Sequence, residues 1–287
     1  MHPIERLRYV ARVGGADAGL VAAEAGYALA AVAAEDPAGL VPACRRLVDR
    51  HTMSGPMWWL AARVLASPDP AGAARQAAHA ISEDALAPAL ARTLPDEVTV
   101  AVIGWPDAAG EALRRRGDLE VLVIDGGGGG SSLARRLEDA DMAVAWVRDA
   151  GTASAVVVSG LVLLEAAAAG PSGILARIGS HAAASVAAQH GVPVWAALGT
   201  GRVLPGPLWD ALLGRVDRMP TEPWDREVEL VPAELLTAAV GSDVGTGGFG
   251  TGGVGTRGVG TGGVSGVTAA LTTSSAPAAP ELLRSVD

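Results

Sequence analysis

The chain has 287 residues, enough for about two domains, and a formal net charge of −9. All 22 basic residues are arginine, which excludes a Schiff-base lysine and a Walker-type phosphate lysine. The longest basic run is Arg114–Arg116, so the sequence argues against nucleic-acid binding through a cationic face. The single cysteine, Cys44, excludes a disulfide framework and a cysteine-rich zinc site, and it fits a reducing, cytoplasmic compartment.

Two apolar stretches could be mistaken for targeting or membrane segments. An alanine-rich stretch over residues 18–34 follows several arginines, but Asp17 and Glu24 interrupt it, so we expect no secretion signal. The long apolar run over 155–176 contains Glu165 and a Gly-Pro break. This run predicts a buried strand followed by a helix, and no membrane span is expected.

Residues 1–95 predict a helical domain. Apolar side chains recur at helical spacing, as in Leu40, Cys44 and Leu47, and prolines punctuate the segments at positions typical of helix starts and ends. We therefore expect a small helical bundle over this range.

Residues 96–241 predict a Rossmann-like domain. Short apolar runs alternate with helical stretches, and the runs cover 99–105, 119–124, 142–147, 156–164 and 192–198. Continuous apolar strands that alternate with helices are typical of a parallel sheet covered on both faces. The expected fold class is thus α/β, with a helical bundle followed by a doubly wound parallel sheet.

Residues 242–287 have a different composition. Glycine-rich pentapeptides of the type GTGGV fill 245–264, and they supply too little apolar side chain to pack. We expect a disordered, flexible tail, with a short helical turn near Leu282–Arg284, and an ordered protein that ends near Gly241.

Two glycine-containing turns are candidate ligand sites at strand ends. Asp125 precedes five glycines at the end of a predicted strand, and backbone N–H groups there could cradle a phosphate, although a slack loop is the alternative. Gly170–Gly173 is expected to join the fourth strand to a helix, with Ser172 as a helix cap or a ligand donor.

Glu165 is the one acidic residue in the apolar run over 155–176. A buried carboxylate needs a partner, so Glu165 is either functional or a solvent-facing strand end, and Arg177 is its candidate partner. The histidines lack metal-ligand spacing, and we expect no metal and no cofactor.

Several segments together resemble the alpha, beta and delta subunits of translation initiation factor 2B and the related aldose–ketose isomerases, which act on methylthioribose 1-phosphate and ribose 1,5-bisphosphate. Residues 176–181 (ARIGSH) look like the family's Asn-Lys-Ile-Gly-Thr-Tyr motif, and 231–237 resemble its Pro-x-x-Leu-Ile-Thr segment. Residues 125–149 resemble a stretch that ends in an Asp-Ala step, here Asp149 and Ala150. Gly15–Ala16 resembles the isomerases' Arg-Gly-Ala phosphate motif.

The departures from the family pattern bear on catalysis. The position of the isomerases' catalytic cysteine falls here on residues 103–106 (IGWP), which look more like the non-catalytic factor subunits. With a one-residue gap the catalytic aspartate falls on Glu165, and otherwise it falls on Ala166. The phosphate-binding arginine becomes Gly14, with Arg12 nearby. A 1,2-proton shift needs a positioned acid and base, so the resemblance implies little isomerase turnover.

The resemblance implies a non-catalytic protein that binds a small phosphorylated ligand, a sugar phosphate or a nucleotide, and has a regulatory or assembly role. It also implies a homodimer or a heterodimer with a paralogue, formed through the Rossmann-like domain. Two alternatives are an isomerase with Glu165 as general base and a structural protein without a ligand. The expected ligand-binding residues are Arg12, Gly104, Trp105, Asp125, Gly126, Asp149, Ser172, Arg177, Gly179 and Ser180.

Overall fold

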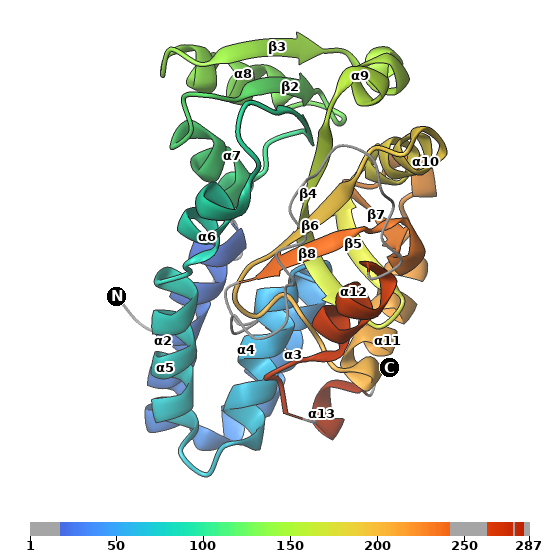
Figure 1. The fold of residues 1–287 in the computed structure, drawn as a ribbon. Helices are drawn as coiled ribbons and strands as arrows, with labels where there is room; N and C mark the ends of the chain where they lie inside the picture. Colours follow the sequence, from blue (N-terminus) through green and yellow to red (C-terminus); the bar gives the residue numbers. More distant parts are fainter. Residues whose placement is uncertain (1–17, 242–262, 278, 284–287) are drawn as a thin grey trace.

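The computed structural model describes residues 18–241, 263–277 and 279–283 (Figure 1). Helices fill the first part of the chain, and strands alternate with helices from Thr99 onward. The change of hydrophobic period at this point therefore marks the same transition in the structure.

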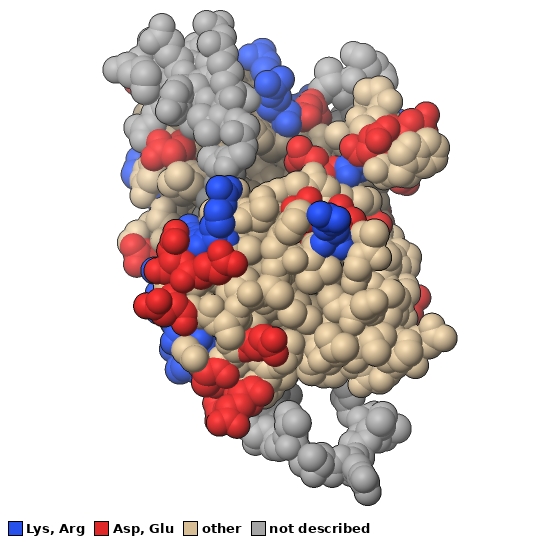
Figure 2. Space-filling view, turned by 90° about the horizontal axis from the view of Figure 1, so that it is seen from above, with Lys and Arg blue, Asp and Glu red and all other residues tan. Residues whose placement is uncertain are grey.

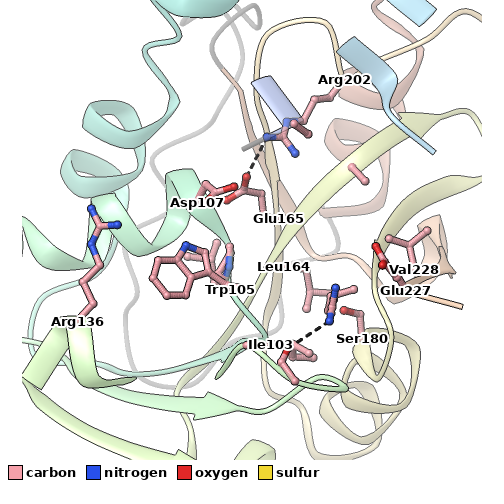
Figure 3. Close-up of a pocket in the computed structure, with 17 residues that line it drawn as sticks. Ile103, Trp105, Asp107, Arg136, Leu164, Glu165, Ser180, Arg202, Glu227 and Val228 are labelled. Carbon is pink, nitrogen blue, oxygen red and sulfur yellow. Dashed lines mark hydrogen bonds and ion pairs between the residues drawn. The ribbon is translucent and has the colours of Figure 1, made fainter. Parts of the chain in front are cut away.

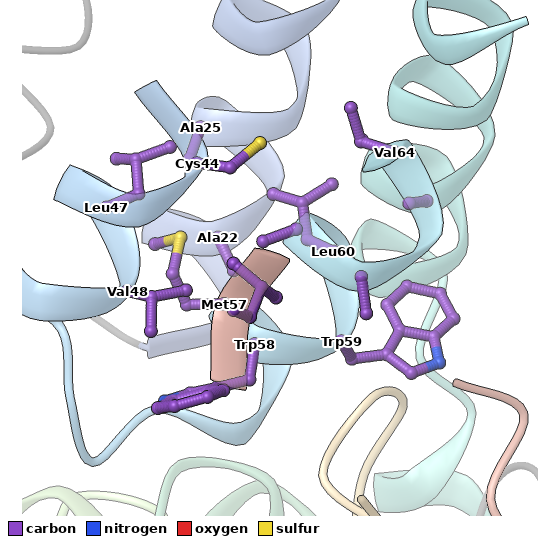
Figure 4. Close-up of a cluster of buried hydrophobic side chains, with 14 of the residues drawn as sticks. Ala22, Ala25, Cys44, Leu47, Val48, Met57, Trp58, Trp59, Leu60 and Val64 are labelled. Carbon is purple, nitrogen blue, oxygen red and sulfur yellow. The ribbon is translucent and has the colours of Figure 1, made fainter. Parts of the chain in front are cut away.

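The N-terminal helices are α2 (Ala18–Glu35), α3 (Leu40–Arg50), α4 (Gly55–Ala66), α5 (Pro70–Ser82) and α6 (Leu86–Thr93), with a 3-10 turn η1 (Pro37–Gly39). Pro70 occupies the first turn of α5, where its missing N–H costs nothing, and the Asp69 carboxylate caps that turn by accepting from the Gly72 N–H at 2.9 Å. The helices bury a shared core that includes Leu47, Trp58 and Leu60 (Figure 4).

Helix α2 is long and apolar enough to cross a membrane by length and composition. In the structure its buried residues, among them Ala22, Ala25 and Leu29, lie in the core of the helical region. Gly26 permits a close approach to α5, since a Cβ at this position would lie 2.8 Å from the Ala78 Cβ. The apolar character of α2 is thus accounted for by packing against its neighbours.

A parallel sheet forms the centre of the second part of the chain. Its strands are β1 (Thr99–Ile103), β2 (Glu120–Ile124), β3 (Ala143–Val147), β4 (Leu161–Gly170), β6 (Val194–Leu198) and β8 (Ala238–Gly241). They lie in the order β3-β2-β1-β4-β6-β8. The chain builds outward from β1 on one side and then returns to the other side, so the sheet is doubly wound and a crevice is expected between the carboxyl ends of β1 and β4.

Helices cover both faces of this sheet. Helices α7 (Asp107–Arg114) and α8 (Gly130–Glu138) pack with α6 on one face, over a core that contains Leu113, Leu133 and Val123. On the other face lie α9 (Thr152–Val158), which follows the 3-10 turn η2 (Asp149–Gly151), and α10 (Ser180–His190). The predicted fold class, a helical region followed by an α/β parallel sheet, is confirmed.

The apolar run over 155–176 was predicted to be a strand followed by a helix, and this prediction is wrong. Its first residues belong to α9, and β4 begins only at Leu161. After β4 the chain makes a hairpin at Pro171–Ser172 and returns as β5 (Gly173–Arg177), antiparallel to the second half of β4. The segment 166–176 is almost entirely apolar and small, so its hydrophobic pattern has neither a helical nor a strand period. The sequence pattern therefore could not distinguish a helix from a second strand here.

Strand β7 (Val228–Pro232) extends this antiparallel layer beyond β5. Between β6 and β8 the chain also forms α11 (Gly206–Asp217) and the 3-10 turns η3 (Pro223–Asp225) and η4 (Ala233–Leu235). The antiparallel layer lies against the helical region, where Leu175 and Trp209 join the same core as Trp58.

The C-terminal segment differs from the expected end of the ordered protein near Gly241. Helices α12 (Gly263–Thr272) and α13 (Pro280–Leu283) return to the body of the molecule, and Leu271 and Leu282 are fully buried. The turn expected near Leu282 is present as α13. The glycine repeats before α12 fall on residues 242–262, outside the described residues.

The Cys44 thiol is expected to be unreactive in the folded protein. Its side chain is fully buried in the helical core, and this burial raises the pKa of the thiol to about 12 (Figure 4). A thiol reagent at about pH 8 should therefore label Cys44 only after denaturant is added. Rapid stoichiometric labelling of the native protein would contradict this burial.

The same shift predicts a pH dependence of stability. The pKa of Cys44 rises on folding from 9.0 to about 12, so the folded state holds the thiol proton more tightly. Its contribution to the free energy of unfolding is complete below about pH 9 and is lost as the pH rises toward 12. Denaturant titrations should show a smaller decline over this range for Cys44→Ala than for the unmodified chain.

Candidate functional site

A cavity of about 570 Å³ opens between the carboxyl ends of β1 and β4 (Figure 3). This is the crevice expected where the strand order of a doubly wound sheet reverses. The charged and polar residues that line it are Asp107, Arg136, Glu165, Arg177, Ser180, Arg202 and Glu227, and apolar lining comes from Ile103, Trp105, Leu163, Leu164 and Val228.

Glu165 and Arg202 form a buried ion pair in this cavity. Arg202 Nη2 lies 2.9 Å from Glu165 Oε1, and the two side chains are 11% and 6% exposed, respectively. The other carboxylate oxygen, Oε2, accepts a hydrogen bond from the Ala109 N–H at 2.9 Å. The predicted partner of Glu165 was Arg177, and this prediction is wrong. The partner comes instead from the loop after β6.

The position of Glu165 follows from a change of partner along β4. Up to Glu165 the strand pairs in parallel with β6, and from Ala166 it pairs antiparallel with β5. Arg202 Nη1 also donates to the Ala166 carbonyl, next to the point of change. The ion pair thus stabilises the residue at which β4 leaves the parallel sheet, and it also satisfies an N–H in the first turn of α7.

The glycine run after β2 is an ordered loop with positive φ angles from Gly126 through Gly129. The Asp149 carboxylate accepts hydrogen bonds from the Gly126 N–H at 2.7 Å and the Gly127 N–H at 3.2 Å. By sequence, the N–H groups of this loop are candidates for binding a phosphate, but those of Gly126 and Gly127 are hydrogen-bonded to the Asp149 carboxylate. Gly128 and Gly129 lie beyond them and line the cavity.

Arg177 connects the glycine loop to the cavity. Its Nε donates to the Gly126 carbonyl at 2.7 Å and its Nη2 donates to the Gly128 carbonyl at 3.2 Å. Both of these hydrogen bonds therefore go to neutral backbone carbonyls rather than to a carboxylate. Gly104 lies against the same side chain with φ +68°, and a Cβ there would come 3.1 Å from Arg177 Cγ. A glycine at position 104 therefore permits both the turn after β1 and the path of Arg177.

Trp105 provides an aromatic wall, and its side chain is 38% exposed. The Arg136 guanidinium, from α8, lies 5.8 Å from the centre of the Trp105 ring (Figure 3). This pair brings a cation and an apolar face together at the mouth of the cavity.

The remaining predicted residues divide into three groups. Ser180 lines the cavity and Gly179 precedes it as the α10 N-cap, with φ +94°. Asp125 lies behind the glycine loop, where its Oδ1 accepts from Trp146 Nε1 at 3.2 Å. Arg12 is outside the described residues.

Ser172 is not where the sequence prediction expected it. It lies in the hairpin between β4 and β5 rather than before a helix, and its Oγ accepts a hydrogen bond from Trp209 Nε1 at 2.7 Å. It does not belong to the residues that line the cavity. Its role as a helix cap is excluded because no helix follows the turn.

Sequence reasoning missed Arg202, Arg136, Asp107 and Glu227 as cavity residues. The sequence does contain an indication for Arg202, because this residue follows residues 199–201 directly after a predicted strand. Loops after strands lie at the carboxyl edge of a parallel sheet. The sequence contains no such indication for Arg136 and Glu227, since their distance from the cavity depends on how α8 and β7 pack. Within the described parts of the chain, no group of three or more His, Cys, Asp or Glu side chains could hold a metal ion.

The fold and the cavity define a two-part α/β protein with a ligand-sized crevice at the carboxyl edge of a Rossmann-like sheet. No protein-family model matches the chain. No curated protein sequence matches it either.

Solved structures of translation initiation factor 2B subunits share this fold. The translation initiation factor eIF-2B of Pyrococcus horikoshii OT3 is 16% identical, with a TM-score of 0.63 over 83% of this chain and 94% of that one. The tetrameric eIF2B-beta2-delta2 complex of C. thermophilum gives 18% identity and a TM-score of 0.63, over 83% and 90% of the chains. The eIF2B delta of Chaetomium thermophilum gives 18% and 0.61, over 83% and 96%. The resemblance to these subunits is confirmed at the level of the fold.

The ion pair can be tested by a double-mutant cycle. Glu165→Gln keeps the shape of the side chain but leaves the buried Arg202 guanidinium without a countercharge, so we expect a loss of about 3–5 kcal/mol in the free energy of unfolding. Arg202→Met should cost a similar amount, and the double variant should cost less than the sum of the two.

Arg136→Gln is the matched control for this cycle. Arg136 also lines the cavity, but its side chain is 53% exposed, so its loss should change the free energy of unfolding by less than about 0.5 kcal/mol. Strict additivity of the Glu165 and Arg202 variants in denaturant titrations would show that the pair is not coupled.

Proposed function

We propose that this chain is a subunit-type relative of the initiation factor 2B alpha, beta and delta proteins that binds a small phosphorylated ligand and does not catalyse isomerisation. The observation that supports this proposal is the cavity between β1 and β4, with Arg177 and Arg136 beside the glycine loop and Trp105. Arginine side chains and backbone N–H groups are the usual ligands of phosphate, and an aromatic wall suits a sugar or a base.

The surroundings of Glu165 favour a binding role over isomerase activity. Both of its carboxylate oxygens already accept hydrogen bonds, from Arg202 and from the Ala109 N–H. A general base must be free to take a proton from a substrate, and here that would break the ion pair. Cys44 cannot supply a thiol, because it is buried in the helical core away from the cavity lining.

The alternative of a structural protein without a ligand is less well supported. A collapsed pocket would leave little open volume, whereas this cavity of about 570 Å³ is of the size that small-molecule sites have. We propose a cytoplasmic protein with a regulatory or assembly role that forms a homodimer or a heterodimer with a paralogue through its Rossmann-like domain. Nucleic acid and membrane are not among its proposed partners.

Ligand binding can be tested by thermal shift with ribose 1,5-bisphosphate, methylthioribose 1-phosphate and nucleoside monophosphates at millimolar concentration. A bound ligand at 100 times its dissociation constant should stabilise the protein by about 2.7 kcal/mol. Arg177→Gln and Arg136→Gln should weaken binding by roughly tenfold or more, because each removes a charge-assisted contact to phosphate. Arg92→Gln, an exposed change outside the cavity, is the control. Absence of stabilisation by every compound would favour the structural alternative.

A coupled isomerase assay on the same two sugar phosphates tests the catalytic alternative. We expect no turnover above background, since the carboxylate is held by Arg202. Clear turnover that disappears in Glu165→Gln, with the variant still folded by circular dichroism, would replace the binding role by catalysis.

A further inference from the structure

The segment that follows α12 crosses from the sheet to the helical region. Helix α12 lies against β8, with Leu271 in the core beside the sheet, and α13 lies against α3 and α11, with Leu282 in the helical core (Figure 1). We call residues 273–277 and 279–283 the strap. The strap is thus anchored at its two ends in different parts of the molecule.

The strap is hydrogen-bonded to the loop that follows β6. Ser274 Oγ donates to the Val203 carbonyl at 2.6 Å and accepts from the Ala276 N–H at 3.1 Å. The bond from Ala276 orients the hydroxyl, because an oxygen that accepts there directs its own hydrogen to another acceptor. Val203 directly follows Arg202, so the strap contacts the backbone next to the arginine of the buried ion pair.

Trp59, from α4, connects the strap to the same loop a second time. Its Nε1 donates to Ser275 Oγ at 2.9 Å, and its side chain is buried. The indole lies against Gly201, where φ is +75° and a Cβ would come 3.1 Å from the ring. The residues on both sides of Arg202 are therefore in contact with the strap or with Trp59.

These contacts bear on the cavity because Arg202 lines it and points toward Glu165 (Figure 3). The Arg202 guanidinium is bonded to Glu165 and to the Ala166 carbonyl, and the Arg202 carbonyl accepts from the Ala169 N–H at 2.7 Å. All of these bonds go to β4. The strap adds a contact from Ser274, which lies 71 residues beyond Val203 in the chain.

Few side chains anchor the strap. Arg45 Nε and Arg215 Nη2 donate to the carbonyls of Glu281 and Leu282 at 2.9 and 3.0 Å. Of the strap residues, Ala279 and Leu282 alone are buried. Segments with few buried apolar contacts open at a lower free energy than the whole domain. The strap can therefore detach while the rest of the molecule stays folded.

We propose that the strap positions Arg202, through Ser274 and through the contact of Ser275 with Trp59, and that a docked strap raises the affinity of the cavity for its ligand. A docked strap fixes this part of the cavity wall in advance, so less ordering accompanies binding. By linkage, the ligand then favours the docked strap. The effect on affinity rests on the function proposed above, whereas the positioning of Arg202 does not.

Hydrogen exchange measures the positioning of Arg202 without any ligand. The N–H groups of Ala169, Arg202 and Leu204 are hydrogen-bonded within or beside the loop, so their exchange reports its opening. The double variant Ser274→Ala, Ser275→Ala removes both strap hydroxyls. It should speed exchange in peptides that contain these N–H groups by about threefold or more.

Two control variants separate this contact from a general loosening of the fold. Thr273→Ala removes a hydroxyl of the strap that donates to the Ala269 carbonyl at 2.8 Å, within the same segment. It should leave the exchange of the loop unchanged. Ser274→Thr with Ser275→Thr keeps both hydroxyls and should restore the exchange of the unmodified chain. Circular dichroism verifies that every variant is folded.

A double-mutant cycle gives a readout that a merely structural strap would not move. In the Ser274→Ala, Ser275→Ala background, the coupling between Glu165 and Arg202 should fall by about threefold or more, expressed as a ratio of equilibrium constants. A strap that only adds stability would lower the free energy of unfolding and leave this coupling unchanged.

Calorimetric titration with ribose 1,5-bisphosphate and nucleoside monophosphates tests the effect on the cavity. The alanine double variant should bind roughly fivefold more weakly or worse, and the control variants should bind as the unmodified chain does. Figure 2 looks down on the end of the molecule that carries β3 and α9 and shows a broad area without charged side chains. That area offers a phosphate no countercharge, whereas the cavity offers Arg177 and Arg136.

Three results would overturn the proposal. Exchange of the loop that is unchanged in the alanine double variant, or equally raised by Thr273→Ala, would show that the strap does not position Arg202. Faster exchange with unchanged affinity would show that the strap does not act on the cavity. An unmodified chain that binds none of the probes contradicts the proposed function instead, and exchange and coupling then decide the positioning of Arg202.

Discussion

The ion pair between Glu165 and Arg202 is the interaction on which the arrangement of the cavity depends. It lies where β4 exchanges a parallel partner for an antiparallel one, and it joins that strand to the start of α7 and to the loop after β6. A carboxylate with 6% side-chain exposure is stable there only because a guanidinium and a backbone N–H satisfy it. Glu165, the candidate catalytic residue of the sequence analysis, thus joins three elements of the fold.

The glycine loop follows a similar principle, since internal groups fill positions that a ligand could otherwise take. Asp149 holds the N–H groups of Gly126 and Gly127, and Arg177 holds two of the loop's carbonyls. These bonds give the loop a fixed shape despite its four positive φ angles. What remains open to a ligand is the side of the loop at Gly128 and Gly129, together with the arginines and Trp105.

The sequence predicted much of the fold, because the relevant signals are local. The Val- and Ile-rich runs predicted over 99–105 and 119–124 contain strands β1 and β2 of the parallel sheet, and the glycine loop and the Gly104 turn lie at its carboxyl edge. The prediction failed over 155–176, where alanine and leucine fit a strand and a helix equally well. The segment after Ser172 forms a strand rather than a helix because it pairs with the second half of β4 on one side and with β7 on the other.

Composition and periodicity by themselves determined the fold class, the presence of a single thiol and the presence of a carboxylate inside an apolar run, since each is a property of the residue types or of neighbouring residues. Only the tertiary structure decided that Glu165 pairs with Arg202 rather than Arg177, that Ser172 lies outside the cavity and that β3 forms an exposed edge. Each of these features depends on a contact between segments that are far apart in the sequence, such as Glu165 and Arg202, which are 37 residues apart. Such contacts are determined by how whole helices and strands pack together, and the local sequence pattern does not specify them.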